Sequence, residues 1–135
     1  MIEKYRVELD QHQQLMLNST MPKILDEVAS RWGDQLSIRE IEGQQRSVTW
    51  AEFHGAVSRL RSGLEAIGVA PGDRVGVLVR NQIEFPVSWF AVAEAGAAIV
   101  PLNPRYTSRE INFVLEDAGA TWLIGLQDLL APMFV

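Results

Sequence analysis

Few side chains in this sequence combine the type and the spacing that catalysis or metal binding requires. The two histidines, His12 and His54, lie far apart, and neither has a carboxylate or a second histidine at metal-ligand spacing. None of the serines stands in the context of a nucleophile elbow. Cysteine is absent, which excludes disulfides, thiolate catalysis and zinc–thiolate sites. We therefore expect structural or solvent-facing roles for both histidines, and we assign no metal site.

Two pairs of acidic residues are candidates for acid–base catalysis by residue type alone. Glu40 and Glu42 lie in an expected hairpin, and Glu116 and Asp117 lie near an expected helix end. Catalytic sites need clusters of cooperating groups, and neither pair has such a cluster around it in the sequence. We interpret both pairs as surface charge, and we assign no catalytic residue.

Phosphate-binding loops depend on glycines whose backbone amides face the phosphates, often beside a lysine. The only lysines are Lys4 and Lys23, and neither follows a glycine-rich loop. Gly68, Gly72 and Gly76 do not have the spacing of the dinucleotide-binding fingerprint. A helix cap, a turn and close strand packing account for these three glycines, so we assign no cofactor-binding residue.

Three arginines lie next to expected strands. Arg74 and Arg80 flank one strand, and Arg105 lies in the loop that follows the next strand. Ligands of open parallel sheets bind beyond the carboxyl ends of the strands. Arg80 and Arg105 are therefore candidates for contact with an anion, and a surface role for both is the alternative.

The stretch 68–124 has the pattern of parallel strands joined by crossover helices. Short apolar runs at 75–79, 97–102 and 121–124 alternate with runs of helical period. The run at 75–79 is apolar on both faces, which is typical of a central parallel strand. Crossovers between such strands are nearly always right-handed.

Capping boxes mark the starts of two helices. One box pairs Thr49 with Glu52, and the second pairs Thr107 with Glu110. A glycine follows the apolar pattern of each helix and predicts its end. The side chains expected on the buried faces of three successive helices are Phe53, Val57, Leu60, Leu64 and Ile67; Phe85, Trp89, Val92 and Ala93; and Ile111, Val114 and Leu115.

The first part of the chain predicts a helix and a hairpin. The helix is expected to begin near Thr20 and to end at Gly33, and the hairpin to join 36–40 with 46–48. Residues 1–19 have weak periodicity and are expected to form an N-terminal arm. The expected fold class is α/β, with a partial parallel βαβαβ sheet, flanking helices and a short N-terminal antiparallel hairpin.

Composition narrows the class of protein further. The 135 residues fit one domain, and fractions of 47% apolar and 21% charged residues are typical of globular chains. A net charge of −5 without a basic block gives no attraction for nucleic acid. The N-terminus lacks the apolar core of a signal peptide. Glu94, Pro86 and Pro101 interrupt the apolar stretch 85–102, so we expect no transmembrane segment and a cytoplasmic protein.

A series of short motifs follows the order and spacing of a known family. The motifs are VTWAEF at 48–53, GL at 63–64, GV at 68–69, PGDRV at 71–75, Asn81, EFP at 84–86, AGA at 95–97, PLNPR at 101–105, Glu110, Leu115 and DAGA at 117–120. With these motifs, the chain resembles the amino-terminal portion of AMP-forming acyl-CoA synthetases over roughly residues 20–126. These synthetases belong to the larger group of adenylate-forming enzymes.

The resemblance implies a ligase that couples a small carboxylic acid to coenzyme A in two steps. The carboxylate attacks the α-phosphate of ATP, which gives an acyl-adenylate and pyrophosphate, and the coenzyme A thiol then displaces AMP. The family's phosphate loop, nucleotide-binding motifs and C-terminal lysine all follow the region that this chain resembles. ATP, magnesium and coenzyme A are therefore expected for the full-length enzyme, with none bound by these residues.

The same resemblance predicts an N-terminal fragment of a larger enzyme. Residues 1–19 would be an arm and 20–135 an incomplete subdomain, whose partner is the missing C-terminal remainder. The apolar ending at 126–135 favours this interpretation, because chain termini are normally polar and exposed. These 135 residues alone are expected to be inactive. The alternatives are a non-catalytic α/β binding module, a remnant of a decayed gene, and an enzyme that uses a carrier-domain thiol in place of coenzyme A.

Overall fold

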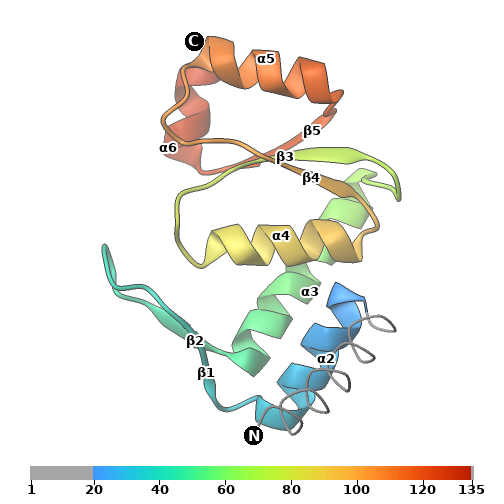
Figure 1. Ribbon diagram of the computed structural model, residues 1–135, viewed down its shortest axis with the longest axis vertical. Coiled ribbons are helices and arrows are strands. Elements are labelled where there is room, and N and C mark those ends of the chain that lie inside the picture. Colours follow the sequence, from blue (N-terminus) through green and yellow to red (C-terminus); the bar gives the residue numbers. More distant parts are fainter. Residues whose placement is uncertain (1–19, 135) are drawn as a thin grey trace, which may run out of the picture.

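The computed structural model describes residues 20–134 and is built around a parallel sheet of three strands (Figure 1). The strands, in the order β4-β3-β5, are β3 (Arg74–Leu78), β4 (Ala98–Pro101) and β5 (Trp122–Gly125). Val75 lies opposite Ile99 on one side and opposite Trp122 on the other. β3 is paired along both edges, and apolar clusters cover both faces of the sheet, so its residues from Val75 to Leu78 are buried, which confirms the predicted central strand.

Helices cover both faces of the sheet (Figure 1). On one face lie α3 (Trp50–Ile67) and α4 (Glu84–Glu94). On the other face lie α5 (Ser108–Ala118), α6 (Gln127–Leu130) and a 3₁₀ turn, η1 (Ala131–Phe134). The first described helix, α2 (Met21–Trp32), packs against α3 and α4. The α/β class and the βαβαβ order of elements are therefore as predicted.

A two-stranded antiparallel hairpin stands beside the helices (Figure 1). Its strands are β1 (Leu36–Arg39) and β2 (Ser47–Thr49), close to the predicted positions. Ile38 and Val48 pack against the larger core cluster, so apolar contacts anchor the strands to the helices. The loop 40–46 joins the two strands, and most of its residues line the candidate site described below.

The predicted capping boxes explain where α3 and α5 begin. The Glu52 amide donates to Thr49 Oγ1 at 3.2 Å, and the Thr49 amide donates to Glu52 Oε2 at 2.8 Å. Thr107 and Glu110 form the same pair of bonds, at 3.4 and 2.8 Å. Each box satisfies backbone amides that have no partner within the helix, so both helix starts are fixed by local sequence.

The three regularly spaced glycines have the structural roles that the sequence predicts. Gly68 ends α3 with φ of 105°, and Gly72 forms a turn with φ of 90°, conformations that other residues rarely adopt. Gly76 lies in β3, where an added Cβ would be 2.6 Å from a δ-methyl of Leu115 and 3.0 Å from one of Leu123. Its lack of a side chain therefore lets α5 pack closely on the sheet.

The core consists of two apolar clusters, one on each face of the sheet. The larger cluster joins α2, α3 and α4 to the sheet, and Phe53 at its centre meets Phe90 edge to face at 5.5 Å. The smaller cluster is formed by Leu78, Leu102 and Ile111, with partly buried side chains from α5, α6 and η1 packed around it. Both clusters depend on β3, since its alternate side chains face opposite sides of the sheet.

The buried face predicted for α4 is confirmed at Val92 and differs at Phe85 and Trp89. Trp89 is 36% exposed and Phe85 is only partly buried. The buried residues of α4 are Val87, Ser88, Ala91 and Val92. The cause is that α4 contacts the sheet, α3 and α2 at once, so apolar residues occur around the whole helix and their period does not select one face. Ile67, expected to be buried in the last turn of α3, is 62% exposed.

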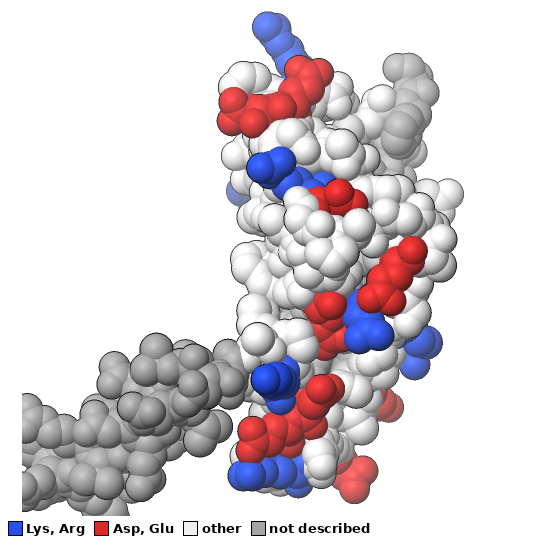
Figure 2. All heavy atoms as spheres, turned by 90° about the vertical axis from the view of Figure 1, so that its right-hand side faces the viewer, with Lys and Arg blue, Asp and Glu red and all other residues white. Residues whose placement is uncertain are grey.

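The described residues show no large basic surface on the face drawn in Figure 2 and include no membrane-spanning helix, in agreement with the predictions from composition. Figure 2 shows acidic and basic side chains interspersed on one face of the molecule, without a continuous basic area. Among residues 20–134, no helix has both the length and the apolar character needed to cross a bilayer. The predicted arm at 1–19 lies outside the described residues.

Candidate functional site

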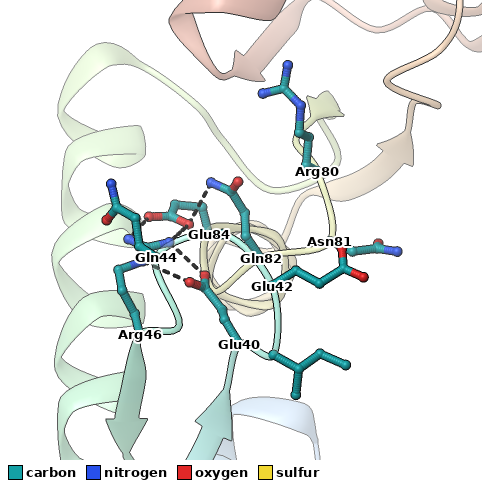
Figure 3. Close-up of a pocket in the computed structure, with 10 residues that line it drawn as sticks. Glu40, Glu42, Gln44, Arg46, Arg80, Asn81, Gln82 and Glu84 are labelled. Carbon is teal, nitrogen blue, oxygen red and sulfur yellow. Dashed lines mark hydrogen bonds and ion pairs between the residues drawn. The ribbon is translucent and has the colours of Figure 1, made fainter.

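A pocket of about 670 Å³ lies beside the carboxyl end of β3 (Figure 3). One wall is the hairpin loop, residues 40–44 with Arg46, and the other is the segment that leads from β3 into α4. Arg80, Asn81, Gln82 and Glu84 come from that second wall. The volume is suited to a small molecule, and the position agrees with the rule that ligands of open α/β sheets bind beyond the carboxyl ends of strands.

Arg46 is the centre of a charged cluster that joins the two walls (Figure 3). Its Nε and Nη2 donate to the carboxylate of Glu40 at 3.0 and 2.7 Å. Its Nη1 and Nη2 donate to the carboxylate of Glu84 at 2.6 and 2.7 Å. Such paired bonds between a guanidinium and a carboxylate are among the stronger hydrogen bonds in proteins. The hairpin loop is thereby fastened to the first residue of α4.

Backbone and amide groups extend this cluster along the second wall. The amide of Ile83 donates to Glu40 Oε1 at 2.9 Å. Gln82 Nε2 donates to Glu84 Oε2 at 2.8 Å. Three consecutive residues of the segment before and at the start of α4 therefore take part in the cluster, and the segment is held from the hairpin side.

The ion pairs shift the titration of the groups that form them. Hydrogen bonds from Arg46 lower the pKa of Glu84 to about 2, and they lower the pKa of Glu40 together with the bond from the Ile83 amide. The two carboxylates in turn raise the pKa of Arg46. All three groups therefore remain charged at neutral pH, and none is suited to exchange a proton as a general acid or base.

Glu40 corrects an interpretation made from the sequence. It was expected to carry surface charge with Glu42, but its side chain is only 9% exposed because Arg46 and the Ile83 amide enclose it. Glu42 is exposed, as expected. The sequence contains no local signal for this cluster, since Glu84 lies 38 residues from Arg46 and only the fold brings them together.

The two arginines predicted to contact an anion are in different places. Arg80 lines the pocket, and its Nη2 pairs with Asp128 Oδ2 of α6 at 2.6 Å. Both side chains of this pair are exposed, and Arg80 lowers the pKa of the Asp128 carboxyl. Arg105 is exposed in the loop after β4 and is not part of the pocket wall. The structure therefore does not bring the two arginines together in this pocket.

The other candidate residues from the sequence have structural or surface positions. His54 Nε2 lies 2.7 Å from Asp26 Oδ1 and joins α3 to α2, while His12 lies outside the described residues. Glu116 and Asp117 are exposed on α5, as expected. Within residues 20–134, no three His, Cys, Asp or Glu side chains are grouped in a way that could hold a metal ion.

A second, smaller pocket of about 400 Å³ lies on α5. Its lining includes Tyr106 and Phe113, which are 41% and 68% exposed, together with Arg109. Glu110 also lines it, but its carboxylate accepts hydrogen bonds from Thr107 in the capping box of α5. This pocket lies on a different element from the pocket at the hairpin loop.

The chemistry available at the larger pocket is hydrogen bonding and positioning. Arg46 is occupied by two carboxylates, and Arg80 by one. Glu42, also in the wall, adds negative charge, so the pocket is not a cradle for a polyphosphate. The amide side chain of Asn81 points away from the Arg46 cluster (Figure 3). It can donate and accept hydrogen bonds with a neutral or polar group.

Comparisons with known proteins agree with the fold. A family model described as AMP-binding enzyme matches residues 25–133. Surfactin synthase subunit 1 of Bacillus subtilis (strain 168) is 33% identical over 115 residues, which are 85% of this chain and 3% of that protein. Feruloyl-CoA synthase of an Amycolatopsis species is 45% identical over 78 residues, 58% of this chain and 16% of that protein.

A solved structure extends the comparison to three dimensions. The inhibitor-bound N-terminal domain of FACL13 from Mycobacterium tuberculosis superposes with a TM-score of 0.77 at 29% identity. The match covers 84% of this chain and 28% of that one. The chain thus spans less than a third of each of these three proteins.

Proposed function

The chain belongs to the AMP-binding enzyme family, and from that premise we propose that it is the N-terminal scaffold of an ATP-dependent acid–CoA ligase. The observation that supports the proposal best is the family match over residues 25–133, on a fold that also matches the N-terminal domain of FACL13. The motif PLNPR at 101–105, which follows the ligase pattern, lies at and after the carboxyl end of β4. The relative with 45% identity is a feruloyl-CoA synthase, which favours coenzyme A as the thiol acceptor.

The proposed reaction joins a carboxylic acid, of the fatty-acid type or a similar class, to coenzyme A. A carboxylate oxygen attacks the α-phosphorus of ATP, and the bond to the pyrophosphate leaving group breaks. The sulfur of coenzyme A then attacks the acyl carbon, and AMP leaves with the bonding electrons. The products are acyl-CoA, AMP and pyrophosphate, and we propose that the enzyme acts in the cytoplasm.

We propose that the pocket at the hairpin loop does not bind the phosphates of ATP. The developing charge on the phosphates needs cations or backbone amides. Arg46 and Arg80 are both paired with carboxylates, and Lys23, the lysine among residues 20–134, lies on α2 and does not line this pocket. We therefore assign no chemical step to these residues and propose that they support a nucleotide site formed by the remainder of the enzyme.

A second candidate is an adenylation unit that transfers its acyl group to a carrier domain. The match to surfactin synthase subunit 1 favours it, since that match extends over 115 residues. The first half-reaction is common to both candidates, and the thiol that accepts the acyl group distinguishes them. A non-catalytic module or a decayed gene would carry out neither half-reaction.

The test uses the complete protein encoded by the gene. ATP–pyrophosphate exchange with a panel of carboxylic acids is expected to reveal adenylation, and coenzyme A is expected to convert the adenylate into a thioester. Transfer only to a carrier domain would favour the second candidate, and absence of exchange with every acid would refute both. As a control, the 135-residue chain alone is expected not to bind ATP with magnesium in titration calorimetry; saturable binding would overturn the scaffold assignment.

A further inference from the structure

The segment 80–84 is held at both of its ends. At the first end, Arg80 pairs with Asp128 of α6 at 2.6 Å. At the other end, Glu84 receives two bonds from Arg46 of the hairpin, and the Ile83 amide donates to Glu40. The segment directly follows β3, so its conformation determines which groups stand at the carboxyl edge of the sheet.

Asn81 is the residue of this segment that the two attachments leave facing the pocket. Its side chain lines the pocket and points away from the Arg46 cluster (Figure 3). The backbone turns sharply around it, since the Gln82 amide donates to the Arg80 carbonyl at 2.8 Å. The direction of the Asn81 side chain therefore depends on where Gln82 and Ile83 are held.

The hairpin loop is suited to hold Gln82 and Ile83 in place. Its strands are anchored on the core through Ile38 and Val48, and its loop reaches the segment through Arg46 and Glu40. The Glu40 carboxylate is largely buried, and charged hydrogen bonds are stronger when shielded from water. Because Arg46 forms a pair of bonds with each of two carboxylates, the geometry of the loop is fixed in more than one direction.

We propose that Arg46 is a positioning residue that fixes the segment 80–84, so that Asn81 presents its amide to a ligand at the carboxyl edge of the sheet. The hairpin then acts as a brace, meaning that its loop holds the segment 80–84 at the carboxyl edge of the parallel sheet. The part of this inference that concerns catalysis rests on the proposed function. The part that concerns the conformation of the segment does not.

Amide hydrogen exchange of Ile83 tests the conformational part in the 135-residue chain. Arg46→Met removes the brace, and the Ile83 amide is expected to exchange on the order of tenfold faster. Arg39→Met, an exposed arginine of β1, is the matched control and is expected to leave this rate unchanged. The Leu102 amide, bonded to the Val77 carbonyl within the sheet, is the internal reference for global unfolding. Unchanged exchange at Ile83 in Arg46→Met would overturn the proposal.

Arg46→Lys keeps the proposal falsifiable if Arg46→Met does not fold. A lysine can pair with one carboxylate at a time but cannot form both pairs of bonds. The Ile83 amide of Arg46→Lys is then expected to exchange faster than that of the wild type, but by less than the roughly tenfold expected for Arg46→Met. A wild-type rate in Arg46→Lys would overturn the role of the paired bonds.

Steady-state kinetics of the complete enzyme test the catalytic part. Arg46→Met is expected to lower kcat for adenylation by about 10- to 100-fold, because misplacement of a positioning group acts on the reacting geometry. Asn81→Ala is expected to lower it similarly, and the double variant no further than either single variant. The positioning role of Arg46 would be overturned if the two single-variant reductions of kcat multiplied in the double variant. A wild-type kcat in Arg46→Met would also overturn it. A wild type without adenylation activity would refute the proposed function, while Ile83 exchange still decides the conformational part.

Discussion

Replacement of Gly76 by alanine tests how closely α5 packs on the sheet. The added Cβ would lie 2.6 Å from a δ-methyl of Leu115, 3.0 Å from one of Leu123 and 3.4 Å from one of Leu102. Carbon atoms pack best at about 3.5–4.0 Å, so the δ-methyl of Leu115 must move by roughly 1 Å. The backbone of β3 cannot move instead, because β3 is hydrogen-bonded along both edges.

The expected loss of stability follows from two opposing contributions. Overpacking of a core costs about 1–3 kcal/mol. An alanine gains roughly 0.5–1 kcal/mol over a glycine through reduced freedom of the unfolded chain. Gly76→Ala is therefore expected to lower the free energy of unfolding by about 0.5–2 kcal/mol, or roughly 2–10 °C in Tm.

Gly63→Ala provides a control with the same chemical change. Gly63 lies in the interior of α3, is exposed, and would place its Cβ in open space. This variant is expected to gain about 0.5–1 kcal/mol. Urea and thermal unfolding followed by circular dichroism measure both variants. If Gly76→Ala is as stable as Gly63→Ala, the close approach of Leu115 and Leu123 to β3 is wrong.

Two further predictions concern pH, with thermal unfolding as the measurement. Burial raises the pKa of Glu94 above 4.5, so the folded state favours the neutral carboxyl. The neutral carboxyl contributes stability at low pH, and this contribution is lost as the pH rises through the folded-state pKa. Glu94→Gln is expected to be more stable than the wild type near pH 7 and equal to it in acid; a constant difference would contradict this. Arg46 lowers the pKa of Glu84 from 4.5 to about 2, so the stability from Glu84 is present above 4.5 and lost as the pH falls towards 2. Glu84→Gln is expected to lose about 1 kcal/mol near pH 7, a figure reduced for a side chain that is 41% exposed, and the loss should vanish in strong acid.

The sequence predicted correctly those features of the fold that depend on interactions between residues a few positions apart. The capping boxes at Thr49 and Thr107 mark the starts of α3 and α5 correctly, because the bonds that they form join residues three apart. Gly68 and Gly119 mark the ends of the same helices, since both adopt the left-handed conformation that glycine tolerates. The uninterrupted apolar run of β3 predicted its central place, because only a strand paired on both edges and covered on both faces has no polar side.

Features that depend on distant partners could not be predicted in the same way. Glu40 looks like a surface charge in the sequence, and its burial results from contacts with Arg46 and with Ile83, which is 43 residues away. The prediction for α4 was correct at Val92 and wrong at Trp89, because the helix is packed on several sides and Trp89 and Val87 are equally apolar in the sequence. The Arg46 cluster, and with it the larger pocket, therefore becomes visible only in the folded chain.

The place of β3 in the sheet has a consequence for synthesis of the chain on the ribosome. β3 is made first, but both of its partner strands come later, and Leu78 meets Gly125 of β5 only after 125 − 78 = 47 further residues. At about 5–20 residues per second, this takes roughly 2–10 s. During that interval an apolar strand with an unpaired edge is open to pairing with another nascent chain. Chains released before Gly125 therefore lack the partner for one edge of β3, and rare codons between β3 and β5 would prolong this exposure.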